Sequence, residues 1–178
     1  MYVLDSFLLL FLQEHVRQAF LTPFFVFLTT LGNKGALWFA ICFALLLFPR
    51  TRRAGALALL SLLLAGGIGH FVMKPLLMRP RPFLELGTLV PLVAKPLTYS
   101  FPSGHTACGF AVALILLRAW RRWYRWLALA LAVLIAFSRL YVGVHYPSDV
   151  LGGFLLAYLV SSLVWHFLGE GVAQLAKS

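Results

Sequence analysis

Long apolar stretches separated by short polar connections dominate the pattern of hydrophobic and polar positions along this chain. A helix needs about 20 predominantly apolar residues to cross a hydrocarbon layer of roughly 30 Å. Five stretches reach or approach that length, at residues 24–48, 54–73, 103–117, 126–144 and 149–168. The pattern therefore predicts an all-α fold, a polytopic membrane helix bundle, whose first span is bent near residues 32–35.

The N-terminal segment has a different pattern. Between residues 4 and 20, apolar positions recur at helical spacing, with polar residues such as Asp5, Glu14 and Arg17 interleaved. Such a segment is typical of an amphipathic helix lying in the membrane interface. We therefore expect an interfacial helix over residues 1–20 and five transmembrane helices, or six if this segment inserts fully.

The connections predict how the bundle is oriented. Residues 74–101 are rich in proline, which interrupts helices, so this segment is expected to be a loop. Lys and Arg in short connections tend to stay cytoplasmic. Two arginine-rich connections fall on one side of a five-span bundle, with Arg50, Arg52, Arg53, Arg118, Arg121, Arg122 and Arg125. The loop is then extracytoplasmic, in a single multi-pass domain over residues 1–178 of the cytoplasmic membrane.

Composition and charge agree with a membrane protein. The 178 residues are 62% hydrophobic and 11% charged, far from the range of soluble proteins. The formal charge of +10 would suggest nucleic acid in a soluble protein. Here the basic residues lie between apolar segments, so membrane lipids with anionic headgroups are the expected partners and nucleic acid is not. The pattern makes no prediction of the oligomeric state.

Three short polar motifs carry candidate chemistry. The first is the segment from Lys74 to Pro82, in which Lys74 and Arg81 stand among rigid prolines. Ionisable residues at the end of a span are often only interfacial anchors. The basic density here favours a cationic wall, because an Arg fork matches phosphate oxygens and Lys supplies a compact charge.

The second motif is Pro102-Ser103-Gly104-His105, directly before an apolar run. Pro followed by Ser predicts a helix start with Ser103 as its cap, and such an N-terminus presents free backbone N–H groups to an anion. Gly104 would let a phosphate approach the backbone closely. His105 beside that site is a candidate general acid or base, because its pKa lies near the operating pH.

The third motif runs from Ser138 and Arg139 to His145 and Asp149. A carboxylate at a membrane-embedded helix end is costly unless it is paired. The turn at residues 146–148 can fold His145 back onto Asp149, four residues away. A carboxylate that holds one ring nitrogen leaves the other oriented for nucleophilic attack, here on phosphorus.

The three segments together resemble the type 2 phosphatidic acid phosphatase family. Its pattern is Lys, six residues, Arg-Pro; then Pro-Ser-Gly-His; then Ser-Arg, five residues, His, three residues, Asp, and every fixed position is met between Lys74 and Asp149. The resemblance implies that His145 is a nucleophile forming a phosphohistidine and that Asp149 orients it. His105 would protonate the leaving oxygen and later activate water. The phosphate would be bound by Lys74, Arg81, Ser103, Gly104 and Arg139.

The expected function is thus a membrane lipid phosphatase that needs no metal or other cofactor, since the five acidic residues are dispersed. The leading substrate is undecaprenyl diphosphate, converted to undecaprenyl phosphate at the extracytoplasmic face. Phosphatidylglycerol phosphate, phosphatidic acid and lipid A phosphates remain alternatives. A lipid transporter or flippase would use the same cations but has no need of a carboxylate-oriented histidine, and a vanadate haloperoxidase ranks last.

The remaining polar residues match no part of the family pattern. His15, His70 and His166 are expected to be interface or packing residues. Arg79 adjoins the expected cationic wall but lies outside the pattern and is given a secondary role.

Overall fold

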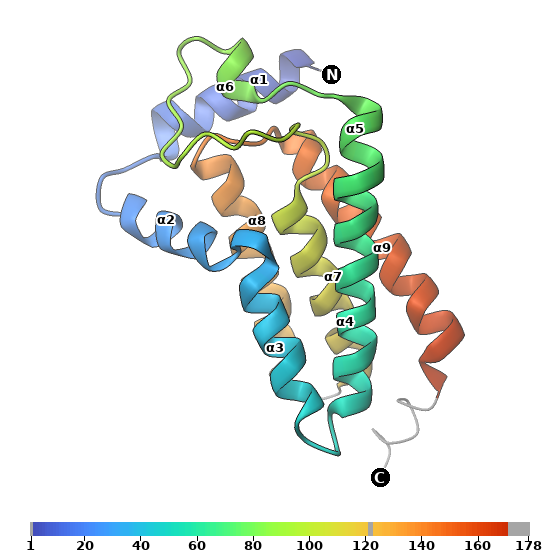
Figure 1. The fold of residues 1–178 in the computed structure, drawn as a ribbon. Coiled ribbons are helices and arrows are strands. Elements are labelled where there is room, and N and C mark those ends of the chain that lie inside the picture. Colours follow the sequence, from blue (N-terminus) through green and yellow to red (C-terminus); the bar gives the residue numbers. More distant parts are fainter. Residues whose placement is uncertain (1, 121–122, 171–178) are drawn as a thin grey trace.

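The described elements of the chain are all helices (Figure 1). This computed structural model describes residues 2–120 and 123–170, so Arg121 and Arg122 of the predicted cytoplasmic cluster lie outside the described residues. The α-helices are α1 (Tyr2–Phe11), α2 (Thr22–Leu31), α3 (Ala36–Leu46), α4 (Arg52–Gly67), α5 (Lys74–Leu77), α6 (Pro82–Glu85), α7 (Gly104–Ala119), α8 (Arg125–Tyr141) and α9 (Pro147–Leu168). The π-helical turns η1 (Leu12–Val16) and η3 (Ile68–Met73) and the 3₁₀ turn η2 (Asn33–Gly35) join some of them.

Helix α7 forms the centre of the bundle. It packs against α4, α8 and α9, and its residues Ala107, Val112 and Ile115 are fully buried. A helix that is apolar on all sides is suited to this place. Small residues let neighbouring helices approach closely, and a Cβ at Gly109 would lie only 3.1 Å from the Trp38 ring of α3. The core is therefore built around α7, the helix that starts at the second motif.

Helices occupy all five predicted spans. The first is the pair α2 and α3, bent by 47° where the sequence predicts a bend. Among the described residues, Arg52–Glu85 and Pro147–Leu168 are long and apolar enough to cross a membrane, and the bent pair would make a third span. Helices α7 and α8 are shorter, with 16 and 17 residues. The number of transmembrane helices stays a prediction.

The second span extends further than the sequence pattern indicates. The helix continues through η3 into α5, so Lys74 lies on a helix and the non-helical segment starts at Met78. Pro75 has no N–H to donate to the preceding turn, and that turn is π-helical. Lys74 is consequently held on a helical end rather than on a loop.

The exterior of the bundle is apolar. Large hydrophobic side chains are exposed along α4, α8 and α9, among them Leu63, Leu127, Leu155, Leu159 and Leu163. Contiguous apolar surface of this kind is suited to lipid. The apolar surface of the helices and the hydrophobic composition both indicate a membrane protein.

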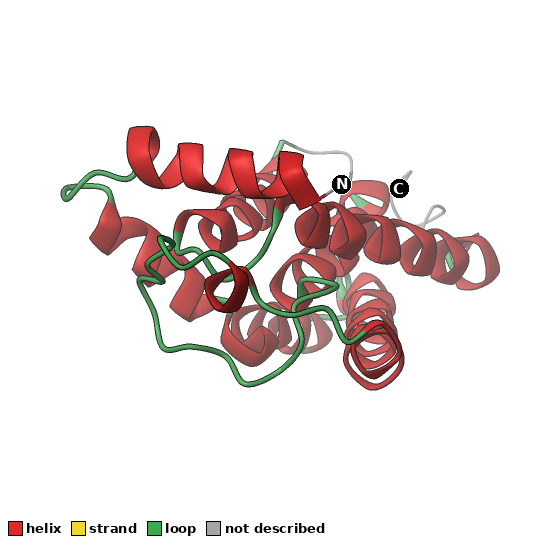
Figure 2. Cartoon of the chain, turned by 90° about the horizontal axis from the view of Figure 1, so that it is seen from above, coloured by secondary structure: helices red, strands yellow, loops and turns green. Residues whose placement is uncertain are grey.

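The N-terminal segment lies across one end of the bundle. In the view from above, α1 and η1 run lengthwise over the helix ends (Figure 2). Arg17 fixes this segment, because its Nε donates to the Tyr141 carbonyl at 2.7 Å and its Nη1 to the Val90 carbonyl at 2.6 Å. Residues 78–102 cover the same end. The interfacial location of this segment stays a prediction.

Candidate active site

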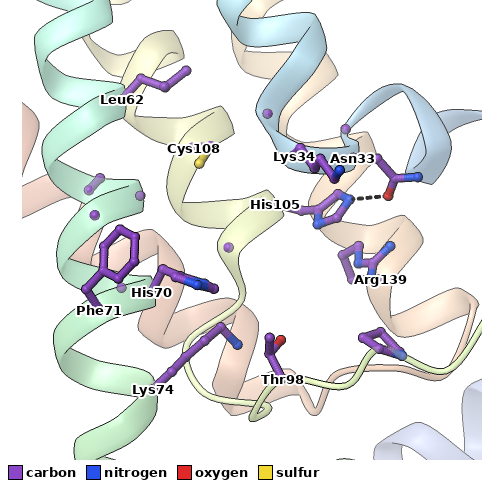
Figure 3. Close-up of a pocket in the computed structure, with 18 of the residues that line it drawn as sticks. Asn33, Lys34, Leu62, His70, Phe71, Lys74, Thr98, His105, Cys108 and Arg139 are labelled. Atoms are coloured by element: carbon purple, nitrogen blue, oxygen red, sulfur yellow. Dashed lines mark hydrogen bonds between the residues drawn. The ribbon is translucent and has the colours of Figure 1, made fainter.

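A cavity of about 510 Å³ opens at the bundle end that carries residues 78–102. Its walls include basic side chains from all three motifs (Figure 3). These residues are Lys74, Arg81, His105, Arg139 and His145. Segments far apart in the sequence thus meet around one space.

His145 lies in the short turn between α8 and α9 and is almost completely buried. Its Nδ1 lies 3.3 Å from Asp149 Oδ2, and its Nε2 lies 3.0 Å from Arg81 Nη1. A guanidinium only donates hydrogen bonds, so Nε2 must accept and the ring proton belongs on Nδ1. These two contacts therefore select the tautomer with its proton on Nδ1, in which the Nε2 lone pair points to Arg81.

Asp149 is held by several donors within the first turn of α9. It is fully buried and accepts from the Tyr146 backbone N–H at 2.9 Å, from Ser100 Oγ and from Arg79 Nη1 at 2.6 Å. The charge-assisted bond from Arg79 and the N–H groups of the helix N-terminus fix the position of both carboxylate oxygens. Asp149 is thereby fixed as the partner of the His145 ring.

Arg79 connects this carboxylate to the N-terminal helix. Its Nη2 lies 2.7 Å from Asp5 Oδ2, and its guanidinium stacks over the Tyr146 ring at 4.2 Å. The Ser148 backbone N–H donates to Asp5 at 3.0 Å. Sequence reasoning gave Arg79 a secondary role and read Asp5 as one polar position of an amphipathic helix. A carboxylate among apolar residues, costly unless paired, was the signal that could have identified Asp5.

The cations that line the cavity have a different set of partners. Arg81 donates to the Thr98 and Val144 carbonyls, both at 2.8 Å, and Lys74 donates to the Tyr99 carbonyl. Arg139 donates to the Thr29 hydroxyl. Within the described part of the chain, none of the three forms an ion pair with a carboxylate. Buried positive charge without a counter-ion is stabilised by an anion, and the cavity is where one fits.

His105 begins the helix α7. Its Nε2 lies 3.2 Å from both the Thr29 carbonyl and Asn33 Oδ1. Both oxygens accept, so Nε2 carries a proton. The ring is thus a proton carrier on the wall of the cavity, and Thr29 connects it to Arg139.

Ser103 caps α7 as the sequence predicts. Its hydroxyl accepts from the Thr106 backbone N–H at 3.4 Å and from the Thr106 hydroxyl at 2.9 Å. It is fully buried and lies behind the cavity wall, so its expected contact with phosphate stays a prediction. Gly104 does line the cavity, and a Cβ there would meet no atom within 4 Å.

Electrostatics keeps the His145 ring neutral. Burial lowers the pKa of His145 well below its ordinary value, and the positive charges of Arg81, Arg139 and Lys74 lower it further. A neutral imidazole with a free lone pair is the nucleophilic form. In residues 2–120 and 123–170, no group of three or more His, Cys, Asp and Glu residues is placed to hold a metal ion.

Most sequence-predicted site residues therefore meet in one place. Six line the cavity: Lys74, Arg81, Gly104, His105, Arg139 and His145. Asp149 and Ser103 do not line the cavity; Asp149 contacts His145, and Ser103 caps α7 next to Gly104. His70, expected from the sequence to be an interface or packing residue, also lines the cavity, and so does Lys34. Neither residue belongs to a motif, and only the fold brings them there.

Comparison with known proteins places this site in a family. The model of the PAP2 superfamily matches residues 54–172. An undecaprenyl-diphosphatase of Sulfolobus acidocaldarius is 37% identical over 145 residues, which are 82% of this chain and 69% of that protein. Undecaprenyl-diphosphatase BcrC of Bacillus subtilis is 34% identical over 106 residues, 58% of this chain and 53% of the relative.

Solved structures agree with these sequence matches. The crystal structure of LpxE from Aquifex aeolicus superposes with a TM-score of 0.77 at 28% identity, covering 88% of this chain and 92% of that one. A transmembrane PAP2-type phosphatidylglycerolphosphate phosphatase from Bacillus subtilis gives a TM-score of 0.74 at 28% identity, covering 95% of this chain and 86% of that one. The fold, the motifs in order and these matches lead to one conclusion: the chain belongs to the PAP2 superfamily, the type 2 phosphatidic acid phosphatase family, and is a membrane phosphatase.

Proposed function

We propose that this phosphatase hydrolyses a lipid diphosphate, undecaprenyl diphosphate, to the lipid monophosphate through a phosphohistidine on His145. One observation carries the proposal. Three buried cations, which form no ion pair with a carboxylate in the part of the chain that the structure describes, face the cavity beside a histidine whose Nδ1 contacts a fixed carboxylate. The relatives named as undecaprenyl-diphosphatases support this choice of substrate.

The first step is attack on the terminal phosphorus. His145 Nε2 forms a bond to phosphorus while the bond from phosphorus to the bridging oxygen breaks. The bridging oxygen leaves with the lipid phosphate and takes up a proton from His105, which enters this step as an imidazolium, the form that a bound phosphate favours, and leaves it neutral. Binding of the phosphate draws Arg81 onto phosphate oxygens and releases the Nε2 lone pair that Arg81 contacts in this structure. The ionised Asp149 stabilises the positive charge that the His145 ring acquires.

The second step removes the phosphate from His145. Neutral His105 takes a proton from a water molecule as the water oxygen bonds to phosphorus, and the bond between phosphorus and Nε2 breaks. Inorganic phosphate and the starting form of both histidines result. Phosphoryl transfer depends mainly on positioning and charge stabilisation, which Lys74, Arg81 and Arg139 provide, with the Gly104 N–H at the helix start.

The cavity walls support a lipid substrate. Beyond the cations the lining becomes apolar, with Phe39 from α3 and Leu62, Leu63 and Phe71 from the α4 and η3 segment. Gly66 and Gly67 lie on the same wall, and a Cβ at Gly67 would meet no atom within 4 Å. An apolar chain can therefore extend between α3 and α4 toward the surrounding lipid while its phosphate stays at the cations.

The proposed location is the extracytoplasmic face of the cytoplasmic membrane. The cavity lies at the bundle end opposite the α3–α4 connection, which carries Arg50 and is followed by Arg52 and Arg53 at the start of α4. Positive residues in short connections favour the cytoplasmic side for that end. Phosphatidylglycerol phosphate, phosphatidic acid and lipid A phosphates remain alternative substrates, and relatives named for the first and the third of these lipids also match.

Phosphate release by purified protein in detergent with EDTA tests this function. The wild type is expected to turn over undecaprenyl diphosphate faster than the three alternative lipids. His145→Ala removes the nucleophile and should abolish release, while His166→Ala, on α9 away from the cavity, serves as the matched control. Ordinary turnover by His145→Ala would contradict the phosphohistidine, and a preference for another lipid would contradict the substrate.

A further inference from the structure

Two basic side chains outside the three motifs line the cavity. Lys34 comes from the bend between α2 and α3, and His70 from η3 (Figure 3). They share this cavity with His105 and Arg139, yet the family pattern assigns them no role. In the described part of the chain, Lys34 has no hydrogen-bonded or ion-paired partner, so its ammonium group is available to an anion.

The backbone at Lys34 is unusual. Its φ of 53° and ψ of 18° lie in the left-handed region, where a lysine is strained and a glycine is not. Residues in such conformations concentrate at functional sites, where the surrounding structure holds them in place. The residue stands at the 47° bend of α2 and α3, so the strained position is also the one that brings a positive charge to the cavity.

The geometry of phosphoryl transfer indicates which part of the substrate the Lys34 ammonium group would contact. The attacking and leaving atoms lie on opposite sides of the phosphorus, so with His145 attacking, the leaving oxygen faces His105. Asn33, next to Lys34, has its Oδ1 3.2 Å from His105 Nε2. Lys34 therefore enters the cavity beside the group that protonates the leaving oxygen. His70 points into the same space from the α4 side, where the lining becomes apolar.

We propose that Lys34 and His70 form a second anion subsite, which holds the lipid-side phosphate of a diphosphate and makes the enzyme selective for an anhydride over a monoester. This inference rests on the proposed function. Lys74, Arg81 and Arg139 bind the terminal phosphate, and a lipid diphosphate carries further charge on the leaving phosphate. Lys34 and the His70 ring N–H meet that charge as it grows on the bridging oxygen. A monoester has an alkyl group there, which gains nothing from either residue.

The test compares two lipids that share one prenyl tail, a diphosphate and a monophosphate, as substrates of the purified protein. The measured quantity is the ratio of kcat/KM for the diphosphate to kcat/KM for the monophosphate. Lys34→Asn keeps a residue type that tolerates the left-handed backbone, so it removes the charge without new strain. We expect the ratio to fall about tenfold or more in Lys34→Asn, and further when His70→Gln is added.

Two further variants separate charge at the subsite from charge in general. Lys34→Arg keeps a cation and should retain most of the selectivity. Lys95→Gln removes an exposed lysine of the 78–102 segment that does not line the cavity and should leave the ratio unchanged. A ratio that stays within about twofold in Lys34→Asn, or falls equally in Lys95→Gln, overturns the subsite.

The wild-type result distinguishes this inference from the function on which it rests. Turnover of the lipid monophosphate without turnover of the diphosphate overturns the second subsite and leaves a lipid phosphatase. Turnover of neither lipid overturns the lipid phosphatase and the subsite together. Preferred turnover of the diphosphate, lost in Lys34→Asn and retained in Lys34→Arg, supports both.

Discussion

Two clusters of buried charge lie on either side of the His145 ring. Behind the ring, Asp149 and Asp5 share Arg79, and backbone N–H and hydroxyl groups complete their hydrogen bonds. In front of the ring, Lys74, Arg81 and Arg139 face a cavity. Among the described residues they donate to carbonyl and hydroxyl oxygens and to His145 Nε2, but to no carboxylate. The first cluster is neutralised within the protein, while the second is left for a ligand to neutralise.

The difference shows how stability and function are divided within one small site. A paired buried charge stabilises the fold only as part of its pair, so its loss should disturb both structure and chemistry. An unpaired buried cation costs stability in the empty protein and becomes favourable when an anion binds. Substitutions in the two clusters are therefore expected to differ in sign as well as in size.

Among substitutions in the two clusters, Asp149→Asn should give the largest loss of activity. The amide no longer stabilises the charged ring or selects the tautomer with a lone pair on Nε2, so kcat should fall about 10³-fold to 10⁴-fold. KM should change little, because Asp149 does not line the cavity. Phosphate release across a range of lipid concentrations measures both constants.

The control for this variant is Glu85→Gln. It removes a carboxylate that accepts from the Tyr146 hydroxyl at 2.7 Å but forms no hydrogen bond with His145 within the described residues, and it should leave kcat within about threefold. An Asp149→Asn enzyme that keeps a tenth of the wild-type kcat would show that orientation of the ring contributes little.

Arg79→Gln and Arg139→Gln should move the stability of the empty protein in opposite directions. Arg79 pairs with two carboxylates, so its loss should lower the free energy of unfolding by about 3–5 kcal/mol. Arg139 lies among other cations, so its loss relieves repulsion and should leave stability unchanged or raised. Thermal unfolding in detergent without phosphate compares the two variants.

Vanadate, a phosphate mimic, extends this comparison to the occupied cavity. At about 100 times its Kd, an anion that binds only the folded state adds about 2.7 kcal/mol of stability. The wild type should gain this stabilisation, and Arg139→Gln should lose most of it. If Arg79→Gln and Arg139→Gln both unfold at a lower temperature than the wild type and gain equal stability from vanadate, the two clusters do not differ as described.

The pH dependence of activity tests whether the positive charges of Lys74, Arg81 and Arg139 lower the pKa of His145. Its lowered pKa means that the ring stays neutral and nucleophilic below pH 6.5, where an ordinary histidine becomes charged. The acidic limb of kcat/KM, corrected for ionisation of the substrate phosphate, should therefore lie below pH 6.5. Arg139→Gln removes one charge that lowers this pKa, so the limb should move to higher pH. An acidic limb of kcat/KM at pH 6.5 in both the wild type and Arg139→Gln would contradict the lowered pKa of His145.

The front cluster and Asp149 were largely predictable from the sequence, whereas the pairing of Asp5 with Arg79 in the rear cluster was not. Fixed spacings identify Lys74, Arg81, Arg139 and His145, because each motif keeps a local geometry that a one-dimensional pattern records. Asp5 and Arg79 are 74 residues apart, and their pairing depends on how α1 crosses the bundle. No local spacing contains that information.

The fold shows the same division. Apolar stretches predicted all five helical spans and the bend at residues 32–35, since burial in an apolar environment acts on each segment separately. The pattern did not predict the extension of helix through Lys74–Leu77, because proline was read there only as a helix breaker. It also gave no reason to place His70 in the cavity, which depends on the rotation of η3 against its neighbours.

Asp5→Asn should give the smallest effect, because Asp5 acts on the chemistry only through Arg79. Without the Asp5 charge, Arg79 keeps its hydrogen bonds to Asp149 and Ser148 but loses an ion pair, so it positions Asp149 less firmly. We therefore expect kcat to fall several-fold with KM unchanged. Asp5→Glu should restore part of the loss, and Glu14→Gln, an exposed carboxylate in η1, is the matched control. Equal losses in Asp5→Asn and Glu14→Gln would make the effect one of general charge. A change in KM alone would place Asp5 with the front cluster instead of the rear one.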